Sequence, residues 1–181
     1  TLDANFISDG NGVGTVPTVI LDQVGVAVPY ISVVKGNATI TADDKRNGTI
    51  TWTINAASNL SDYGKAVLVD TLPADQTYIA DEIYWGAVKI DENTEPSAVI
   101  SADGRTLTII FNTTPQALAT RQAFTVKTKI DPEVYGQNIN RNFSNQVTGR
   151  LLSQVDESVL VSASSTRNVR ITNTVISKSS S

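Results

Sequence analysis

Few side chains in this sequence could take part in catalysis or bind a metal, and the residue types present exclude several kinds of active site. There is no histidine and no cysteine, so Ser-His-Asp and Cys-His nucleophiles are excluded, as are thiolate or imidazole metal sites. The carboxylates form adjacent pairs in polar, turn-rich stretches, namely Asp43/Asp44, Asp81/Glu82 and Asp91/Glu92. Such pairs are typical of solvated loop charges rather than of a glycosidase. Asp9 opens a glycine-rich segment that begins like a calcium loop, but Ile20 stands where such a loop needs a bidentate Glu. We therefore expect no enzyme activity, no cofactor and no metal site.

Asparagines in the Asn-x-Ser/Thr pattern are candidate glycosylation sites. They are Asn37, Asn47, Asn59, Asn112 and Asn142. Chance accounts for most of them, because the chain contains 14 asparagines and 38 serines and threonines. In an archaeal or eukaryotic source, these predicted strand and turn positions could carry glycans.

Strict alternation of apolar and polar residues predicts half-buried strands. Ile50, Trp52 and Ile54 alternate with threonines, and the same period follows the turn at 102–105 and recurs from Phe124. We expect the alternating apolar residues to be buried: Trp52, Ile54, Leu68, Leu107, Ile109, Phe111, Phe124 and Val126. Strands are predicted at 18–27, 30–35, 37–42, 49–56, 65–70, 76–80, 83–90, 97–101, 105–112, 122–131, 142–153, 157–163 and 166–176. Turns are predicted at 45–48, 91–93 and 102–105, and only 131–136, with Pro132 at its first position, is predicted as a helical turn.

Composition agrees with an all-β protein and excludes two classes of partner. The chain has 181 residues, 40% of them apolar, with a net charge of −4, so it can bury a core without metals or disulfides. It has no basic cluster longer than two residues, so nucleic acid is not an expected partner. It has no run of 18 apolar residues, so no membrane span is expected.

Three segments and one short step resemble a known family. The segments are Gly48–Asn55 (GTITWTIN), Val69–Pro73 (VDTLP) and Phe124–Ile130 (FTVKTKI), and the step is Ser144–Val147 (SNQV). They are similar to collagen-adhesin-type (Cna-like) and conserved-repeat domains of microbial cell surfaces. The resemblance covers residues 30–175 and implies an immunoglobulin-like β-sandwich, here with an N-terminal extension carrying an extra strand. The alanines that follow Asn55 depart from the family pattern.

The resemblance also implies a self-made isopeptide cross-link, which many such domains contain. It would join Lys35 to Asn145, with Asp70 acting only as the promoting acid. Strand parity supports two of these positions, since Lys35 shares a face with Val33, and Asn145 shares one with Val147. Burial would lower the pKa of the lysine, and a protonated carboxyl would polarise the amide. The alternative is a surface lysine, a turn aspartate and a solvated asparagine.

The predicted organisation is an arm at 1–28, a β-sandwich domain at 29–178 and a tail at 179–181. The arm contains a β-branched segment that a lone sandwich has no obvious place to bury. As a donor strand it would insert apolar side chains into a neighbouring subunit: Val19, Leu21, Val24, Val26 and Val28.

We therefore expect a structural protein of the microbial cell surface whose partners are copies of itself in a filament. The alternative is a stalk or ligand-binding module of a wall-anchored adhesin, with a host or neighbouring-cell ligand. An enzyme or carbohydrate-binding module is less favoured. The chain starts at Thr1 without an initiator Met, which suggests an extracellular protein with a removed signal peptide.

Overall fold

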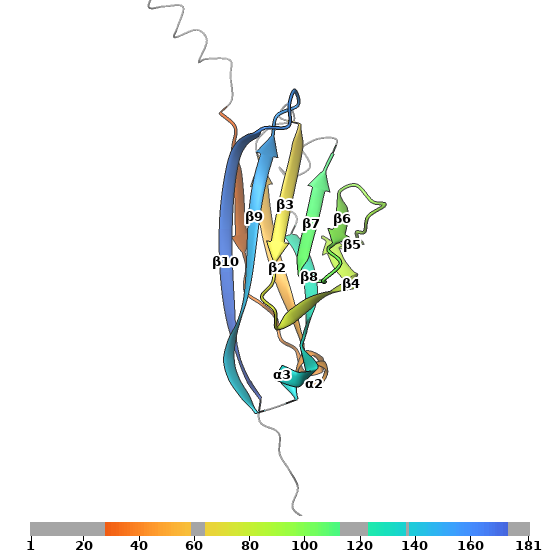
Figure 1. Cartoon of the computed structure of the whole chain (residues 1–181), viewed down its shortest axis with the longest axis vertical. Helices are drawn as coiled ribbons and strands as arrows, with labels where there is room; N and C mark the ends of the chain where they lie inside the picture. Colours follow the sequence, from red (N-terminus) through yellow and green to blue (C-terminus); the bar gives the residue numbers. More distant parts are fainter. Residues whose placement is uncertain (1–27, 59–63, 113–122, 137, 174–181) are drawn as a thin grey trace, which may run out of the picture.

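Two five-stranded antiparallel sheets face each other in the computed structural model, which describes residues 28–58, 64–112, 123–136 and 138–173 (Figure 1). The first sheet has the order β1-β2-β8-β4-β5, formed by Ile31–Lys35, Thr49–Ser58, Ala123–Ile130, Gln76–Trp85 and Val88–Lys89. The second has the order β10-β9-β3-β7-β6, formed by Val159–Asn173, Ile139–Leu152, Lys65–Thr71, Thr106–Phe111 and Ser97–Ile100. This arrangement confirms the predicted all-β, immunoglobulin-like sandwich.

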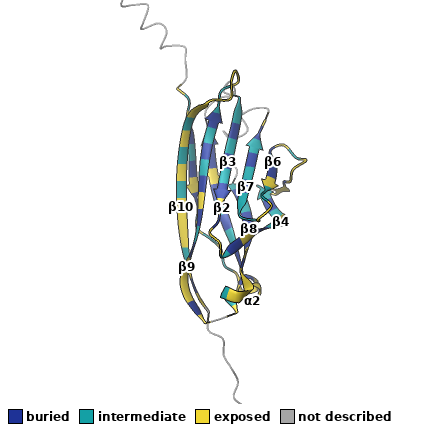
Figure 2. Ribbon diagram, viewed as in Figure 1, coloured by how far each residue is buried: buried dark blue, intermediate teal, exposed yellow. Residues whose placement is uncertain are grey.

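The core lies between the sheets, and buried residues alternate with more exposed ones along strands such as β2, β3, β7, β8 and β9 (Figure 2). The eight residues predicted to be buried are all buried, and Trp52, Ile54, Leu68, Leu107, Ile109, Phe124 and Val126 have no exposed surface at all. Because the side-chain period of a strand is two, each of these faces was specified by the sequence. Burying each large apolar side chain contributes about 1.5–3 kcal/mol.

The predicted strand at 37–42 is wrong, and so is the predicted turn at 45–48. Thr39 makes only an isolated bridge to Thr51, and helix α2 follows at Ala42–Asn47. Thr41 caps this helix, since its side chain accepts from the backbone of Asp44 and the Asp44 side chain accepts from the backbone of Thr41. The helix ends at Gly48, which has a left-handed backbone with φ 68°. The apparent turn was thus the last turn of a helix with its glycine cap.

In two places, a pair of strands that was predicted as separate belongs to one longer strand in the structure. The strands at 157–163 and 166–176 form the single strand β10, up to Asn173. Strand β4 continues from 76 to 85, but its pairing with β8 is interrupted between Tyr78 and Ile83. The predicted helical turn is confirmed as α3, Pro132–Tyr135. The predicted strand at 18–27 lies outside the described residues.

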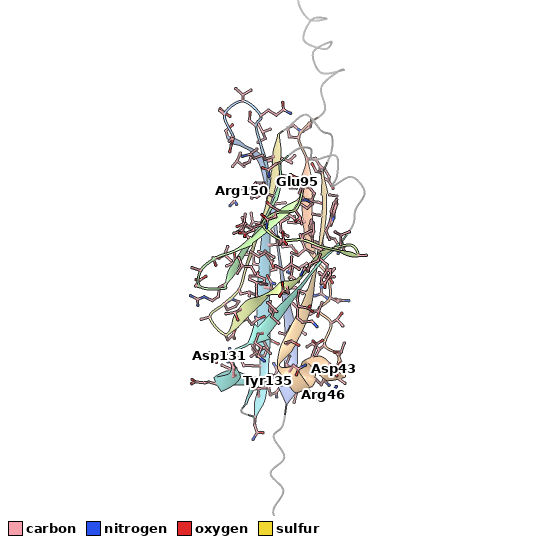
Figure 3. The ribbon with its side chains drawn as sticks, turned by 90° about the vertical axis from the view of Figure 1, so that its right-hand side faces the viewer. Asp43, Arg46, Glu95, Asp131, Tyr135 and Arg150 are labelled. Atoms are coloured by element: carbon pink, nitrogen blue, oxygen red, sulfur yellow. The ribbon has the colours of Figure 1, made fainter. Side chains whose placement is uncertain are left out.

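Helices α2 and α3 lie together at one end of the sandwich, where Figure 3 shows Asp131 and Tyr135 beside Asp43 and Arg46. The hydroxyl of Tyr135 donates to the backbone carbonyl of Lys45 at 2.6 Å, and this bond joins the two helices. Strand β10 ends at the same end of the molecule, whereas β1 starts near the opposite end (Figure 1). The two ends of the described chain are therefore far apart along the long axis.

Candidate cross-linking site between the sheets

Three strands place polar side chains in the middle of the core. On β1, Lys35 continues the inward face of Ile31 and Val33. On β3, Asp70 points inward after Ala66 and Leu68. On β9, the inward positions are Phe143, Asn145 and Val147, and Val147 pairs directly with Asp70. Asp70 and Asn145 therefore approach from one sheet, and Lys35 approaches from the other.

Lys35, Asp70 and Asn145, the residues that the resemblance implied, meet in one buried cluster. Lys35 Nζ lies 3.1 Å from Asp70 Oδ1 and 3.4 Å from Oδ2. Asn145 Nδ2 donates to Asp70 Oδ2 at 3.0 Å. All three are buried, with residue exposures of 2%, 0% and 0%. The alternative of a surface lysine, a turn aspartate and a solvated asparagine is therefore wrong, because all three residues are buried. A lysine is almost never fully buried without a partner, and here the partner is Asp70.

Two further residues complete the cluster, and sequence reasoning did not assign them to it. Tyr78 donates its hydroxyl to Asp70 Oδ2 at 2.8 Å. The ring centroid of Trp52 lies 5.4 Å from Lys35 Nζ. Trp52 was predicted only as a core residue. The signal for Tyr78 was its parity with Gln76 in the strand that follows the Asp70–Pro73 corner.

A second buried polar network lies beside the cluster. Trp52 Nε1 donates to Thr128 Oγ1 at 3.0 Å and to Gln76 Oε1 at 3.3 Å. Gln76 Nε2 donates across the core to the backbone carbonyl of Ser144 at 3.0 Å. This bond fixes the backbone next to Asn145, so the network holds the asparagine and the tryptophan in place.

Burial moves the pKa values of the ion pair toward each other. Desolvation lowers the pKa of Lys35, opposed by the nearby charge of Asp70 and its hydrogen bond. Desolvation raises the pKa of Asp70, opposed by Lys35, Tyr78 and Asn145. Burial and the neighbouring Asp70 raise the pKa of Tyr78, so its hydroxyl stays protonated. Transfer of a proton from Lys35 to Asp70 is therefore much easier here than in water.

The arrangement can support attack of an amine on an amide. A neutral Lys35 would be a nucleophile, and the amide carbon of Asn145 would be the electrophile. Asn145 Oδ1 is buried with no hydrogen-bond partner. A half-turn of the amide exchanges its oxygen and nitrogen, so a protonated Asp70 could then donate to that oxygen. An unpaired buried acceptor costs about 1–3 kcal/mol, which a donating Asp70 would recover.

The remaining predicted site residues lie elsewhere. Val28 is 79% exposed, whereas Val19, Leu21, Val24 and Val26 lie outside the described residues. The candidate glycosylation sites Asn37, Asn47, Asn112 and Asn142 are exposed, and Asn59 lies outside the described residues.

Among the carboxylate pairs, the expectation of a solvated charge is wrong for Asp44. It is buried at 2% exposure, and it accepts from the Thr49 hydroxyl and the Thr41 backbone. Its role is to start α2. Within the described part of the chain, no three His, Cys, Asp or Glu residues are grouped to hold a metal ion, and no helix is long and apolar enough to cross a membrane.

The two packed sheets and the buried Lys35–Asp70–Asn145 cluster define an immunoglobulin-like β-sandwich with a polar cluster in its core as the class of structure. No family model and no curated protein matches the sequence. Similar solved structures include BcpA, the major pilin subunit of Bacillus cereus, with a TM-score of 0.50, 12% identity, and 79% of this chain and 40% of that chain covered.

The full-length major pilin SpaD of Corynebacterium diphtheriae has a TM-score of 0.50 and 14% identity over 77% of this chain and 35% of that one. A collagen-binding domain from a Staphylococcus aureus adhesin has a TM-score of 0.46 and 13% identity over 81% of this chain and 99% of that one. At these identities the likeness to the two pilins shows the fold alone. The chain spans well under half the length of the two pilins.

Proposed function

We propose that this chain is a non-catalytic structural subunit of the microbial cell surface that polymerises into an extracellular filament and is strengthened by an internal Lys35–Asn145 isopeptide bond. The observation that carries the proposal is the buried Lys35–Asp70–Asn145 cluster between the sheets. The fold, shared with two pilin subunits, supports the surface role.

The proposed bond forms in balanced steps. Lys35 Nζ gives a proton to Asp70 Oδ2, 3.4 Å away on the side that faces Asn145, and becomes a neutral amine. Its lone pair attacks Asn145 Cγ, while Asp70 donates its proton to the amide oxygen. As the tetrahedral intermediate collapses, the C–Nδ2 bond breaks and the leaving nitrogen takes up the proton that Nζ releases. The carbonyl re-forms by returning the oxygen's proton to Asp70, and the departing ammonia takes that proton and leaves as ammonium. Asp70 ends as the carboxylate it began as, so it acts as a general acid and base in a single turnover.

The bond would resist extension of the subunit. It would close a loop of about 110 residues, for which cross-linking theory gives a stabilisation of about 5 kcal/mol. Because β1 starts near one end of the sandwich and β10 ends at the other, tension along the filament would enter at β1. It would then cross to β9 through the covalent bond instead of unzipping the sheets. A surface fibre under load needs this property.

Intact mass tests the cross-link. The wild-type chain, produced recombinantly without glycans, should be lighter than its sequence mass by one ammonia. Asp70→Ala should restore the full mass. Asp131→Ala, at an exposed aspartate that caps α3, is the matched control and should keep the loss. A wild-type chain at full sequence mass contradicts the cross-link.

We propose that polymerisation uses residues 16–28 as a donor strand to a neighbouring subunit. Extended, this segment spans about 43 Å, and its anchors would be Val19, Leu21, Val24, Val26 and Val28. Each anchor buried in the neighbour would contribute about 1.5–3 kcal/mol. Both sheets of the described fold end in edge strands, which a strand from another subunit can extend.

Electron microscopy of the full chain and of a chain lacking residues 1–28 tests this assembly. The full chain should form filaments, and the truncated one should stay monomeric and bind a synthetic 16–28 peptide. A peptide with Val24→Asp and Val26→Asp is the control and should not bind. Filaments from the truncated chain, or a full chain that stays monomeric at high concentration, would favour the stalk or ligand-binding module of an adhesin instead.

We also propose that the candidate glycosylation sites carry glycans in the native source. The four that the structure describes are exposed at the surface, so a glycan on any of them would not disturb the core. Mass spectrometry of native peptides should find glycan on Asn37, Asn47, Asn112 or Asn142. Unmodified peptides at all of them would refute this proposal without touching the cross-link.

A further inference from the structure

We infer that the hydroxyl of Tyr78 is a positioning group for the cross-linking reaction, holding the Asp70 carboxyl so that Oδ2 faces Asn145 and stays within reach of Lys35 Nζ. The inference rests on the cross-link proposed above. It assigns a residue that the sequence pattern did not select.

The backbone fixes Tyr78 more firmly than an ordinary strand position. Tyr78 pairs with Thr128 of β8, but the pairing stops there and resumes only at Ile83. The backbone N–H of Tyr78 donates to the carbonyl of Gly104 at 2.8 Å, in the hairpin between β6 and β7 of the opposite sheet. The residue is thus tied to both sheets, and it is only 7% exposed. Its hydroxyl has little freedom to move.

The three donors around Asp70 divide its two oxygens unequally. Tyr78 donates to Oδ2 at 2.8 Å, and Asn145 Nδ2 donates to the same oxygen at 3.0 Å. Lys35 Nζ is nearer to Oδ1, at 3.1 Å, than to Oδ2, at 3.4 Å. The phenol therefore keeps Oδ2 on the asparagine side of the cluster and within reach of Lys35 Nζ, so that the proton that Oδ2 takes from the lysine can pass to the amide oxygen.

Two consequences separate this role from simple packing. Without the hydroxyl, the carboxyl can rotate, and the reaction should slow by about tenfold, the factor that corresponds to one hydrogen bond. The Tyr78 hydrogen bond also lowers the pKa of Asp70, so its loss should raise that pKa. Because the reaction needs a protonated Asp70, the alkaline limb of the rate against pH should move to higher pH.

The test follows the loss of ammonia over time. Full-length chain recovered from inclusion bodies is unfolded in urea, so that the three residues are apart, and is then diluted into buffers of increasing pH. Intact mass gives the rate for wild type and for Tyr78→Phe, which keeps the ring. Tyr135→Phe is the matched control, because it also loses one hydroxyl hydrogen bond, to the Lys45 carbonyl far from the cluster. Only Tyr78→Phe should slow the reaction and shift its pH dependence.

The outcomes separate this inference from the cross-link itself. A wild type that keeps its ammonia overturns the cross-link, and the role of Tyr78 with it. A wild type that loses ammonia while Tyr78→Phe keeps pace, with the same pH profile, overturns the role of Tyr78 alone. In an Asn145→Ala chain, which cannot react, carbon-13 NMR of the Asp70 carboxyl gives a second readout. Adding Tyr78→Phe should raise the Asp70 pKa, and an unchanged value overturns the inference.

Discussion

Removing Asp70 from the core should leave the lysine opposite it without a counterion. Lys35 has a fully buried side chain, and its Nζ is 3.1 Å from Asp70 Oδ1. Breaking a buried ion pair by truncating one partner costs about 3–5 kcal/mol, because the remaining charge is uncompensated. Asp70→Ala should therefore lower the free energy of unfolding by this amount. Replacing both partners, by Asp70→Ala with Lys35→Met, should cost much less than the sum of the single changes.

The measurement must be separated from the cross-link, since either single change would abolish it. All four chains should therefore carry Asn145→Ala, which prevents the reaction in each of them. Urea unfolding followed by the fluorescence of the buried Trp52 gives each free energy of unfolding. The double-mutant cycle should give a coupling of about 2–3 kcal/mol between Lys35 and Asp70.

The exposed pair Lys65–Glu157 is the matched control for that cycle. Its charged atoms lie 3.2 Å apart, and its side chains are 38% and 62% exposed. Because water screens both charges, the coupling there should be about 0–1 kcal/mol. The reasoning is refuted if the Lys35 and Asp70 changes add to within about 0.5 kcal/mol, the scatter expected for independent sites.

Three further predictions concern the scaffold. Gly149→Ala should destabilise the fold by about 1–3 kcal/mol in urea unfolding, because the new Cβ would lie 2.7 Å from Val33 Cγ1 of the opposite sheet. Trp52→Phe should cost about 1–3 kcal/mol, since it removes the indole N–H from which the buried Thr128 hydroxyl oxygen accepts at 3.0 Å, whereas Gln76 Oε1 keeps its bond from Thr128; an unchanged urea midpoint contradicts this. Although burial raises the pKa of Asp44, the hydrogen bonds that it accepts lower that pKa overall from 3.8. The stabilisation that the Asp44 carboxylate contributes is thus fully present above pH 3.8 and is lost as the pH falls through the lower pKa of Asp44 in the folded protein. Asp44→Asn should therefore make the free energy of unfolding less dependent on pH in the acid range.

The buried face of β2 and the start of α3 could be predicted from the sequence, because a local residue pattern determines each of them. The alternation around Trp52 specified which residues of β2 are buried, because a strand turns successive side chains to opposite faces. Pro132 predicted the start of α3 because its fixed φ suits the first position of a helix. Helix α2 was missed because its apolar content is low, so no period marked it. Its stability comes from caps at Thr41 and Gly48; the sequence pattern placed Thr41 in a strand at 37–42 and Gly48 in a turn at 45–48.

The sequence by itself determined an all-β sandwich and, through family resemblance, the three residues of the expected cross-link. Only the tertiary structure brings Lys35, Asp70 and Asn145 into contact, because they are far apart in the chain and come from both sheets. It alone brought the hydroxyl of Tyr78 to Asp70, since that contact depends on where the break in β4–β8 pairing lies. Strand parity specifies which face a side chain is on. The packing of one sheet on the other specifies which side chain it meets, and with it whether a buried charge has a partner.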